Sequence, residues 1–269
     1  MSTQVVNRLL DIIDALSANG PATVVELAGQ LGLPRPTAYR LVKALELRGY
    51  IRRDPQSSQI SLGVKLIELG QVARADFDFA RLAAPVMREL VEKWQETCHL
   101  LIREGDQAVI IERVESPQSV RVSYPPGRRI KLFQGASSQC ILAFIDEREL
   151  DTLLGRWERN VELAEEYPGS KALLERLRGI RRDGFNVTQG EVFPEVAAVA
   201  VPVRTPGGEY GAISLNVPAS RFRADQVPEL AASLRDSACQ LVAQYGQPKS
   251  DLIGGTQSSK HLVGKAAQL

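Results

Sequence analysis

The sequence has few residues of the types on which catalysis and metal binding most often depend. Its 269 residues include only two histidines, His99 and His261, and three cysteines, Cys98, Cys140 and Cys239. No Cys–His spacing of a zinc site, no phosphate-binding glycine loop and no nucleophile elbow occurs in it. We therefore predict no catalytic residue, no metal and no cofactor, and we predict that the protein is not an enzyme.

Long apolar runs and an excess of charge of either sign are also absent. No apolar run approaches the roughly 20 residues that cross a bilayer, and the first residues form an amphipathic pattern rather than a signal segment. The odd number of widely spread cysteines favours a reducing compartment. With 33 basic and 32 acidic residues, the formal net charge is +1. We expect a cytoplasmic protein with no membrane partner, in which any affinity for nucleic acid is local.

What the sequence does contain is organised around residues 31–62. Apolar side chains at helical spacing over residues 38–45 predict an amphipathic helix, which Gly49 can end in the left-handed conformation. Residues 50–53 and 59–62 predict two short strands joined by a turn. The segment therefore reads as a helix followed by a β-hairpin.

Two further helices are predicted before this segment. Apolar residues recur at helical spacing over residues 6–16, and Gly20 and Pro21 end that pattern. Thr23 and Glu26 have the spacing of a capping box at the start of the second helix. Helix, helix, basic helix and basic hairpin is the order of a winged helix-turn-helix.

Positive charge is concentrated on the third helix and the hairpin. Six basic residues lie between residues 35 and 53, in a chain that is almost neutral overall. Either group alone could be ordinary solvated charge, but with this order of elements they predict binding to the DNA phosphate backbone. Arg40 is the candidate for base contact, because its planar guanidinium can pair with a guanine edge. The predicted DNA-contacting residues are Arg35, Thr37, Tyr39, Arg40, Lys43, Arg52 and Arg53.

The rest of the chain predicts a linker helix and an α+β domain. Residues 63–77 have roughly helical apolar spacing, interrupted by Gly70, and their exposed apolar positions would suit the pairing of two chains. Helices and antiparallel strands then alternate. From residue 246 onward no periodicity remains, which predicts a disordered tail. The predicted strands are 98–103, 107–114, 119–123, 185–192, 196–204 and 209–217, and the predicted helices are 82–96, one from 135, 147–156, 171–183 and 224–245.

A series of short motifs runs in order through both halves of the chain. The motifs are VVNRLLDIIDAL, LGLPRPTAYRLVKALELRGYIRRD, SLGVKLIELG, GRR at 127–129, GAS at 135–137, ILA at 141–143, RDGF at 182–185, GE at 190–191, VAAVAVPV at 196–203, GAISL at 211–215 and PASRF at 218–222. In these motifs the chain resembles the IclR-type bacterial transcriptional regulators over about residues 5–245. The resemblance implies a winged helix-turn-helix at residues 1–63, a linker helix at 64–80, and a GAF-like effector-binding domain at 81–246, with residues 247–269 as the tail. It also implies a dimer or tetramer that binds double-stranded operator DNA.

The chain departs from the family pattern at three places. Pro36 stands where the family often has a helix-capping serine. A common lysine is replaced near Ser138 and Gln139, and Cys140 takes a position often held by alanine. These changes suggest a ligand different from those of the best-known members.

The resemblance implies an effector pocket between the sheet and the helix that starts at Gly135. Small residues that open a helix leave backbone amides free at the positive end of its dipole, which suits an anion. A small or aromatic carboxylic acid is therefore the predicted effector. The alternative is that this stretch is only a helix start and Ser214 only a sheet residue. The predicted effector-binding residues are Gly135, Ala136, Ser137, Ser138, Cys140, Glu191, Ala198, Ser214 and Asn216.

The sequence of the C-terminal half leaves two other functions open. It could serve only to assemble subunits without binding a ligand. It could also be a cysteine-dependent hydrolase with a Cys140–His99 pair, although no further sequence signature supports catalysis.

Overall fold

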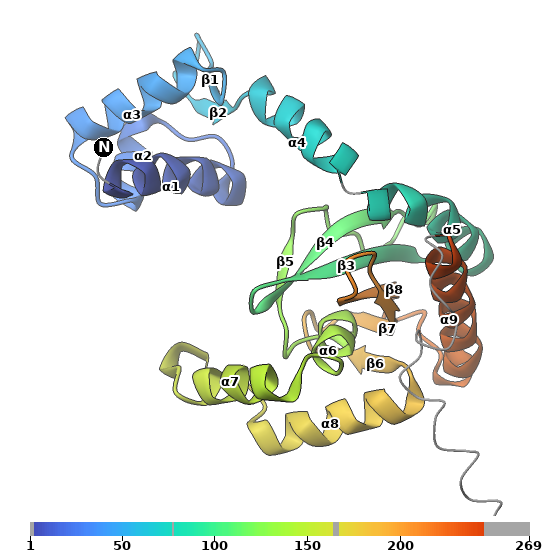
Figure 1. The fold of residues 1–269 in the computed structure, drawn as a ribbon. Coiled ribbons are helices and arrows are strands. Elements are labelled where there is room, and N and C mark those ends of the chain that lie inside the picture. Colours follow the sequence, from blue (N-terminus) through green and yellow to red (C-terminus); the bar gives the residue numbers. More distant parts are fainter. Residues whose placement is uncertain (1–2, 77, 164–166, 245–269) are drawn as a thin grey trace, which may run out of the picture. The chain divides into compact units, whose positions relative to one another are not determined.

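The computed structural model describes residues 3–76, 78–163 and 167–244 (Figure 1). The predicted tail at 247–269 lies outside these residues, as does His261. The chain divides into two compact units, Met1–Phe77 and Asp78–Leu269. The predicted linker at 64–80 therefore spans the division, and its last residues, 78–80, belong to the first helix of the second unit.

The first unit is a winged helix-turn-helix, as predicted. Antiparallel pairing joins the two wing strands in the register Ile51↔Leu62 and Arg53↔Ile60. Ala22, in the turn before the second helix, pairs with Ile60 through two backbone hydrogen bonds of 3.1 and 2.8 Å, which attaches the wing to the helices. The elements are α1 (Thr3–Asn19), α2 (Val24–Gln30), α3 (Arg35–Leu47), β1 (Ile51–Arg53), β2 (Ile60–Leu62) and α4 (Val64–Asp76).

Local signals in the sequence set the ends of these helices. The Glu26 amide donates to Thr23 Oγ1 at 3.3 Å, and the Thr23 amide donates to Glu26 Oε2 at 2.7 Å, which confirms the capping box. Gly49 follows α3 with φ of +75°, as the predicted left-handed stop requires. Gly70 lies within α4 and does not interrupt it.

The second unit is a six-stranded antiparallel sheet with helices on both faces (Figure 1). The strand order is β5-β4-β3-β8-β7-β6, so β3 and β8 are neighbours although more than a hundred residues separate them in sequence. The elements are α5 (Asp78–Trp94), β3 (Thr97–Glu104), β4 (Gln107–Val114), β5 (Arg129–Lys131), α6 (Ala136–Leu142), α7 (Glu147–Glu158), η1 (Val161–Leu163), α8 (Ser170–Asp183), β6 (Asn186–Gln189), β7 (Val196–Arg204), β8 (Tyr210–Pro218), η2 (Ala224–Gln226) and α9 (Val227–Ala243).

The sheet separates two hydrophobic cores. Helices α5 and α9 pack on one face against Val199, Val201 and Val203 of β7. Helices α6, α7 and α8 cover the other face, where β7 presents Ala198 and Ala200. The two faces differ because side chains alternate along a strand. The small residues on the α6 side leave space next to the sheet.

The structure corrects the prediction of a strand at residues 119–123. No strand is assigned there within the described residues, and β5 pairs with β4 instead. Side chains hold the segment in place of a backbone ladder: Ser123 Oγ donates to Glu115 Oε1 at 2.6 Å, and Arg113 Nη1 donates to Ser123 Oγ at 2.8 Å. Residues 119–123 are therefore a loop held by side-chain hydrogen bonds.

Within the described residues, no helix is long and apolar enough to cross a membrane. The same residues contain no group of three or more His, Cys, Asp or Glu side chains that could hold a metal ion.

Candidate functional site

Helix α3 exposes the predicted DNA contacts on the side opposite its core-facing stripe. Arg35, Tyr39, Arg40 and Lys43 are exposed, and Thr37 is half-buried. This separation follows from the helical repeat, which places residues three or four apart on the same side. Among the described residues, no ion pair involves Arg40. The helix therefore presents cationic and hydrogen-bonding side chains on one exposed strip.

The turn before α3 has no side-chain cap, and its cap position is held by Pro34 rather than by Pro36. Pro34 is the N-cap and makes no side-chain cap, but its carbonyl accepts from the amides of Thr37 and Ala38 at 2.9 and 3.0 Å. Pro36 lies in the first turn, where an amide would have no partner within the helix. Pro36 is therefore compatible with an intact helix start.

The two wing arginines lie in different environments. Arg52 is exposed, and its Nε donates to Ser61 Oγ at 3.0 Å on the paired strand. Arg53 is half-buried, with its Nε 3.5 Å from Glu46 Oε1, while Glu46 Oε2 lies 3.9 Å from Lys43 Nζ. Glu46 thus offsets part of the positive charge of Arg53 and Lys43. Arg52 is the wing residue that presents its charge to solvent.

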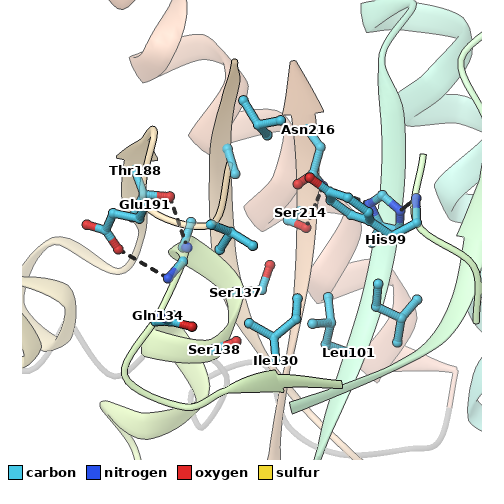
Figure 2. Close-up of a pocket in the computed structure, with 17 residues that line it drawn as sticks. His99, Leu101, Ile130, Gln134, Ser137, Ser138, Thr188, Glu191, Ser214 and Asn216 are labelled. Atoms are coloured by element: carbon cyan, nitrogen blue, oxygen red, sulfur yellow. Dashed lines mark hydrogen bonds between the residues drawn. The ribbon is translucent and has the colours of Figure 1, made fainter. Parts of the chain in front are cut away.

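In the second unit, a cavity lies between α6, the sheet and the loops at its rim (Figure 2). All the predicted effector-binding residues except Cys140 line it. Its free space is about 40 Å³, a few times the ~10–15 Å³ that one water molecule needs. The lining residues are His99, Leu101, Ile110, Tyr124, Ile130, Gln134, Gly135, Ala136, Ser137, Ser138, Thr188, Glu191, Val192, Val196, Ala198, Ser214 and Asn216.

Cys140 is the one predicted effector-binding residue that does not line the cavity. Its side chain is fully buried in the core between α6 and the sheet, and its thiol lies 3.4 Å from the Ala200 carbonyl oxygen. Burial raises the pKa of the Cys140 thiol well above its ordinary value, so the thiolate is disfavoured. The thiol therefore packs against β7 and does not line the cavity.

The start of α6 is also less open than predicted. The Gly135 amide donates to Glu191 Oε2 at 3.1 Å, and the Ala136 amide donates to Thr188 Oγ1 at 3.1 Å (Figure 2). Two of the amides expected to be free therefore already have acceptors from the segment around β6. Glu191, predicted as a ligand contact, holds the helix start in place as well as lining the cavity.

One end of the cavity is a polar cluster that joins the predicted residues Ser214 and Asn216 with His99, which was not predicted to line it. His99 on β3 pairs across the sheet with Ser214 on β8, and Asn216 lies two residues farther on the same face. Asn216 Nδ2, on its side chain, lies 2.8 Å from His99 Nδ1 and donates to Ser214 Oγ at 3.2 Å. Only the β3–β8 pairing brings His99 to this site, and no signal near His99 in the sequence indicates it.

His99 is buried and neutral. The Tyr124 backbone amide donates to His99 Nε2 at 3.3 Å. Because a backbone amide can only donate, His99 Nε2 accepts this hydrogen bond and carries no proton. Burial, aided by the positive charge of Arg113, lowers the pKa of His99 to about 4.

Aromatic rings cover the rim of the cavity beside His99. Tyr124 stacks on His99 with a centroid separation of 5.6 Å and on Phe193 with one of 5.5 Å. The Arg128 guanidinium lies 4.6 Å from the Tyr124 centroid and 5.0 Å from the Phe193 centroid. The loops that carry these residues are thus held together over the cavity by stacking and cation–π contacts.

Comparison with known proteins identifies both units. Residues 5–55 match the IclR helix-turn-helix domain, and residues 72–243 match the family described as bacterial transcriptional regulator IclR C-terminal. The HTH-type transcriptional regulator KipR of Bacillus subtilis is 30% identical over 225 residues, which cover 83% of this chain and 90% of KipR. The HTH-type transcriptional regulator KdgR of Escherichia coli is 29% identical over 246 residues, covering 91% of this chain and 94% of KdgR.

Solved structures have the same fold. The IclR transcriptional regulator of Alicyclobacillus acidocaldarius superposes with a TM-score of 0.78 at 25% identity, covering 91% of this chain and 100% of that one. An IclR homologue from Microbacterium hydrocarbonoxydans, in complex with 4-hydroxybenzoate, has a TM-score of 0.73 at 20% identity over 89% of this chain and 99% of that one. The curated relatives are named as transcriptional regulators and not as enzymes. The chain belongs to the IclR family of bacterial transcriptional regulators, with a helix-turn-helix DNA-binding domain at its N-terminus.

Proposed function

We propose that this protein is a transcription factor whose affinity for operator DNA is modulated by a small carboxylic acid bound in the second unit. Residues 1–63 bind the DNA, residues 64–80 link the two domains, and residues 81–246 bind the effector and assemble subunits. The protein acts in the cytoplasm, where the operator lies. The observation that carries the proposal is the cavity with one polar end, in the effector domain of a chain whose family regulates transcription.

The lining of the cavity supports an acid as the effector. Ser138 Oγ is buried and has no hydrogen-bond partner among the described residues, so a ligand oxygen there would satisfy it. Leu101, Ile110 and Ile130 provide an apolar wall for the body of the ligand. The free space of about 40 Å³ suits an acid of a few non-hydrogen atoms. A ring such as the 4-hydroxybenzoate of the Microbacterium homologue is larger than this space, so lining side chains would have to move to admit it.

Thermal unfolding distinguishes a domain that binds an effector from a domain that only assembles subunits. A ligand that binds the folded state stabilises it by RT ln(1 + [L]/Kd), so a saturating effector raises Tm and a plain assembly module shows no shift. Acids of increasing size are the first panel to test. Hydrolysis of acyl substrates that Cys140→Ala abolishes would instead support the cysteine-dependent hydrolase.

Assembly as a homodimer or homotetramer is supported by apolar side chains on α4. Val64, Ile67 and Val72 are 64%, 65% and 64% exposed, which is unusual for large aliphatic residues. A twofold operator would place two copies of the first unit side by side. Light scattering of the full chain with and without DNA tests this part of the proposal, and a monomer on DNA would contradict it.

Salt-dependent gel shifts with the DNA upstream of the protein's own gene test DNA binding. Contacts with phosphates release counterions, so affinity should fall steeply as salt rises. Specific binding must also exceed binding to competitor DNA. Failure on this fragment and in a genome-wide pull-down would contradict the transcription-factor proposal.

We expect Arg40→Ala to reduce discrimination at one operator base pair by roughly 5- to 150-fold, because a good bidentate contact contributes about 1–3 kcal/mol. Affinity measured across operators randomised one position at a time locates the effect. Unchanged affinity and unchanged preference would show that α3 docks differently.

Arg52→Ala is the contrasting variant. Because Arg52 is exposed on the wing, its loss should weaken binding to all sequences similarly and lower the slope of log affinity against log salt by about one. Arg53→Ala should have a smaller effect, since Glu46 already offsets part of its charge. A change in base preference with Arg52→Ala would assign the wing to base readout instead.

A further inference from the structure

Glu191 is the one charged residue among the described residues that line the cavity. Its Oε2 accepts hydrogen bonds from the Gly135 amide at 3.1 Å and from Gln139 Nε2 at 2.9 Å. Its Oε1 accepts from Arg176 Nη1. A carboxylate at the wall of a cavity proposed to bind an acid is electrostatically unfavourable unless a cation compensates for it.

Arg176 supplies that cation from outside the cavity. It lies on α8, its side chain is 46% exposed, and it borders a second hollow together with Pro168 and Leu173. Glu191 lines both hollows and is 26% exposed, so it stands between the guanidinium and the cavity. Arg176 can therefore act on a ligand through Glu191 without touching it.

Gln139 contacts both members of this ion pair and connects them to the start of α6. It is buried, its Nε2 donates to the Phe133 carbonyl at 2.8 Å, and its Oε1 accepts from Asn186 Nδ2 at 2.9 Å. Arg176 Nη1 lies 3.4 Å from the same Oε1. Both the nitrogen and the oxygen of the Gln139 side chain are thus hydrogen-bonded, and this neutral side chain adds no charge to the site.

We propose that Arg176 is a specificity-determining residue: it neutralises Glu191 and thereby lets the cavity accept an anionic ligand. The inference rests on the proposed function, because it concerns the charge of the effector in the same cavity. Without Arg176, the Glu191 carboxylate repels a ligand carboxylate and leaves a neutral ligand of the same shape almost unaffected.

Matched acid and amide pairs test the inference on the full chain. The probes are lactate with lactamide and 4-hydroxybenzoate with 4-hydroxybenzamide, with Kd measured by calorimetry. Arg176→Met keeps the length of the side chain and removes its charge. We expect it to weaken binding of the acid by about tenfold, the order expected for two like charges several ångströms apart at an intermediate dielectric constant. Binding of the amide should change by less than about twofold.

Three further variants distinguish charge from structure. Arg176→Lys retains the charge and should restore binding of the acid. Arg176→Met combined with Glu191→Gln removes both charges and should also restore it. Arg178→Met changes an exposed arginine on the same helix and should leave both affinities as in the wild type.

Two results would overturn the inference while the proposed function stands: an unchanged acid-to-amide ratio in Arg176→Met, or equal loss of acid and amide without rescue by Arg176→Lys. If no acid in the panel binds the wild-type chain, the inference is overturned together with the carboxylate effector. Operator binding in the gel shift then decides separately whether the protein remains a DNA-binding regulator.

Discussion

Acidification from pH 7 to pH 4 should lower the free energy of unfolding of the second unit by about 3 kcal/mol through His99 alone. The pKa of His99 is about 4 in the folded protein and about 6.5 in an unfolded chain. Between these values the unfolded state binds a proton that the folded state does not, so stability falls as pH falls. Above pH ~6.5 the residue contributes no pH dependence, and below pH ~4 its full cost is present.

Denaturant unfolding at several pH values, with His99→Gln as the comparison, measures this effect. The glutamine amide can accept from the Tyr124 amide but does not titrate in this range. Carboxylates contribute equally to both proteins, so the difference between the two stability curves isolates the imidazole. Parallel curves between pH 7 and pH 4 would mean that His99 titrates normally and that the polar end of the cavity is hydrated.

The second large effect concerns Gly63, where the chain leaves the wing and enters α4. A Cβ at this position would lie 2.2 Å from the Gly49 carbonyl oxygen and 2.9 Å from the Ile51 nitrogen. The Gly63 amide donates to the Tyr50 carbonyl at 2.8 Å, so the two backbones cannot separate without losing that bond. We expect Gly63→Ala to destabilise the first unit by about 3 kcal/mol and to weaken DNA binding through the displaced wing.

Gly70→Ala is the matched control for Gly63→Ala. A Cβ at Gly70 contacts nothing within 4 Å, and the residue lies inside α4. Alanine should therefore stabilise the helix by roughly 0.5–1 kcal/mol. Calorimetry of the full chain, with hydrogen exchange of the wing amides, reports both changes. If the two substitutions shift the free energy of unfolding in the same direction, close backbone packing is not the reason why residue 63 is a glycine.

Most of the first unit could be predicted from the sequence because its structure depends on short-range signals. The Thr23–Glu26 capping box, the left-handed Gly49 and the stripe on α3 each involve residues within about one helical turn of one another. Local hydrogen bonds and helical periodicity are encoded at these distances. The exposed side of α3, and with it the candidate DNA contacts, followed from the same periodicity.

The cavity needed the tertiary structure. Helix periodicity and composition predicted the α+β class and the small residues around Gly135, but the pairing of β3 with β8 decided that His99 joins Ser214 and Asn216. Only the folded chain brings Glu191 and Thr188 to accept hydrogen bonds from the amides at the start of α6, and brings Arg176 into an ion pair with Glu191. These contacts join segments separated by many residues, whose distances depend on sheet order and packing rather than on local sequence preference.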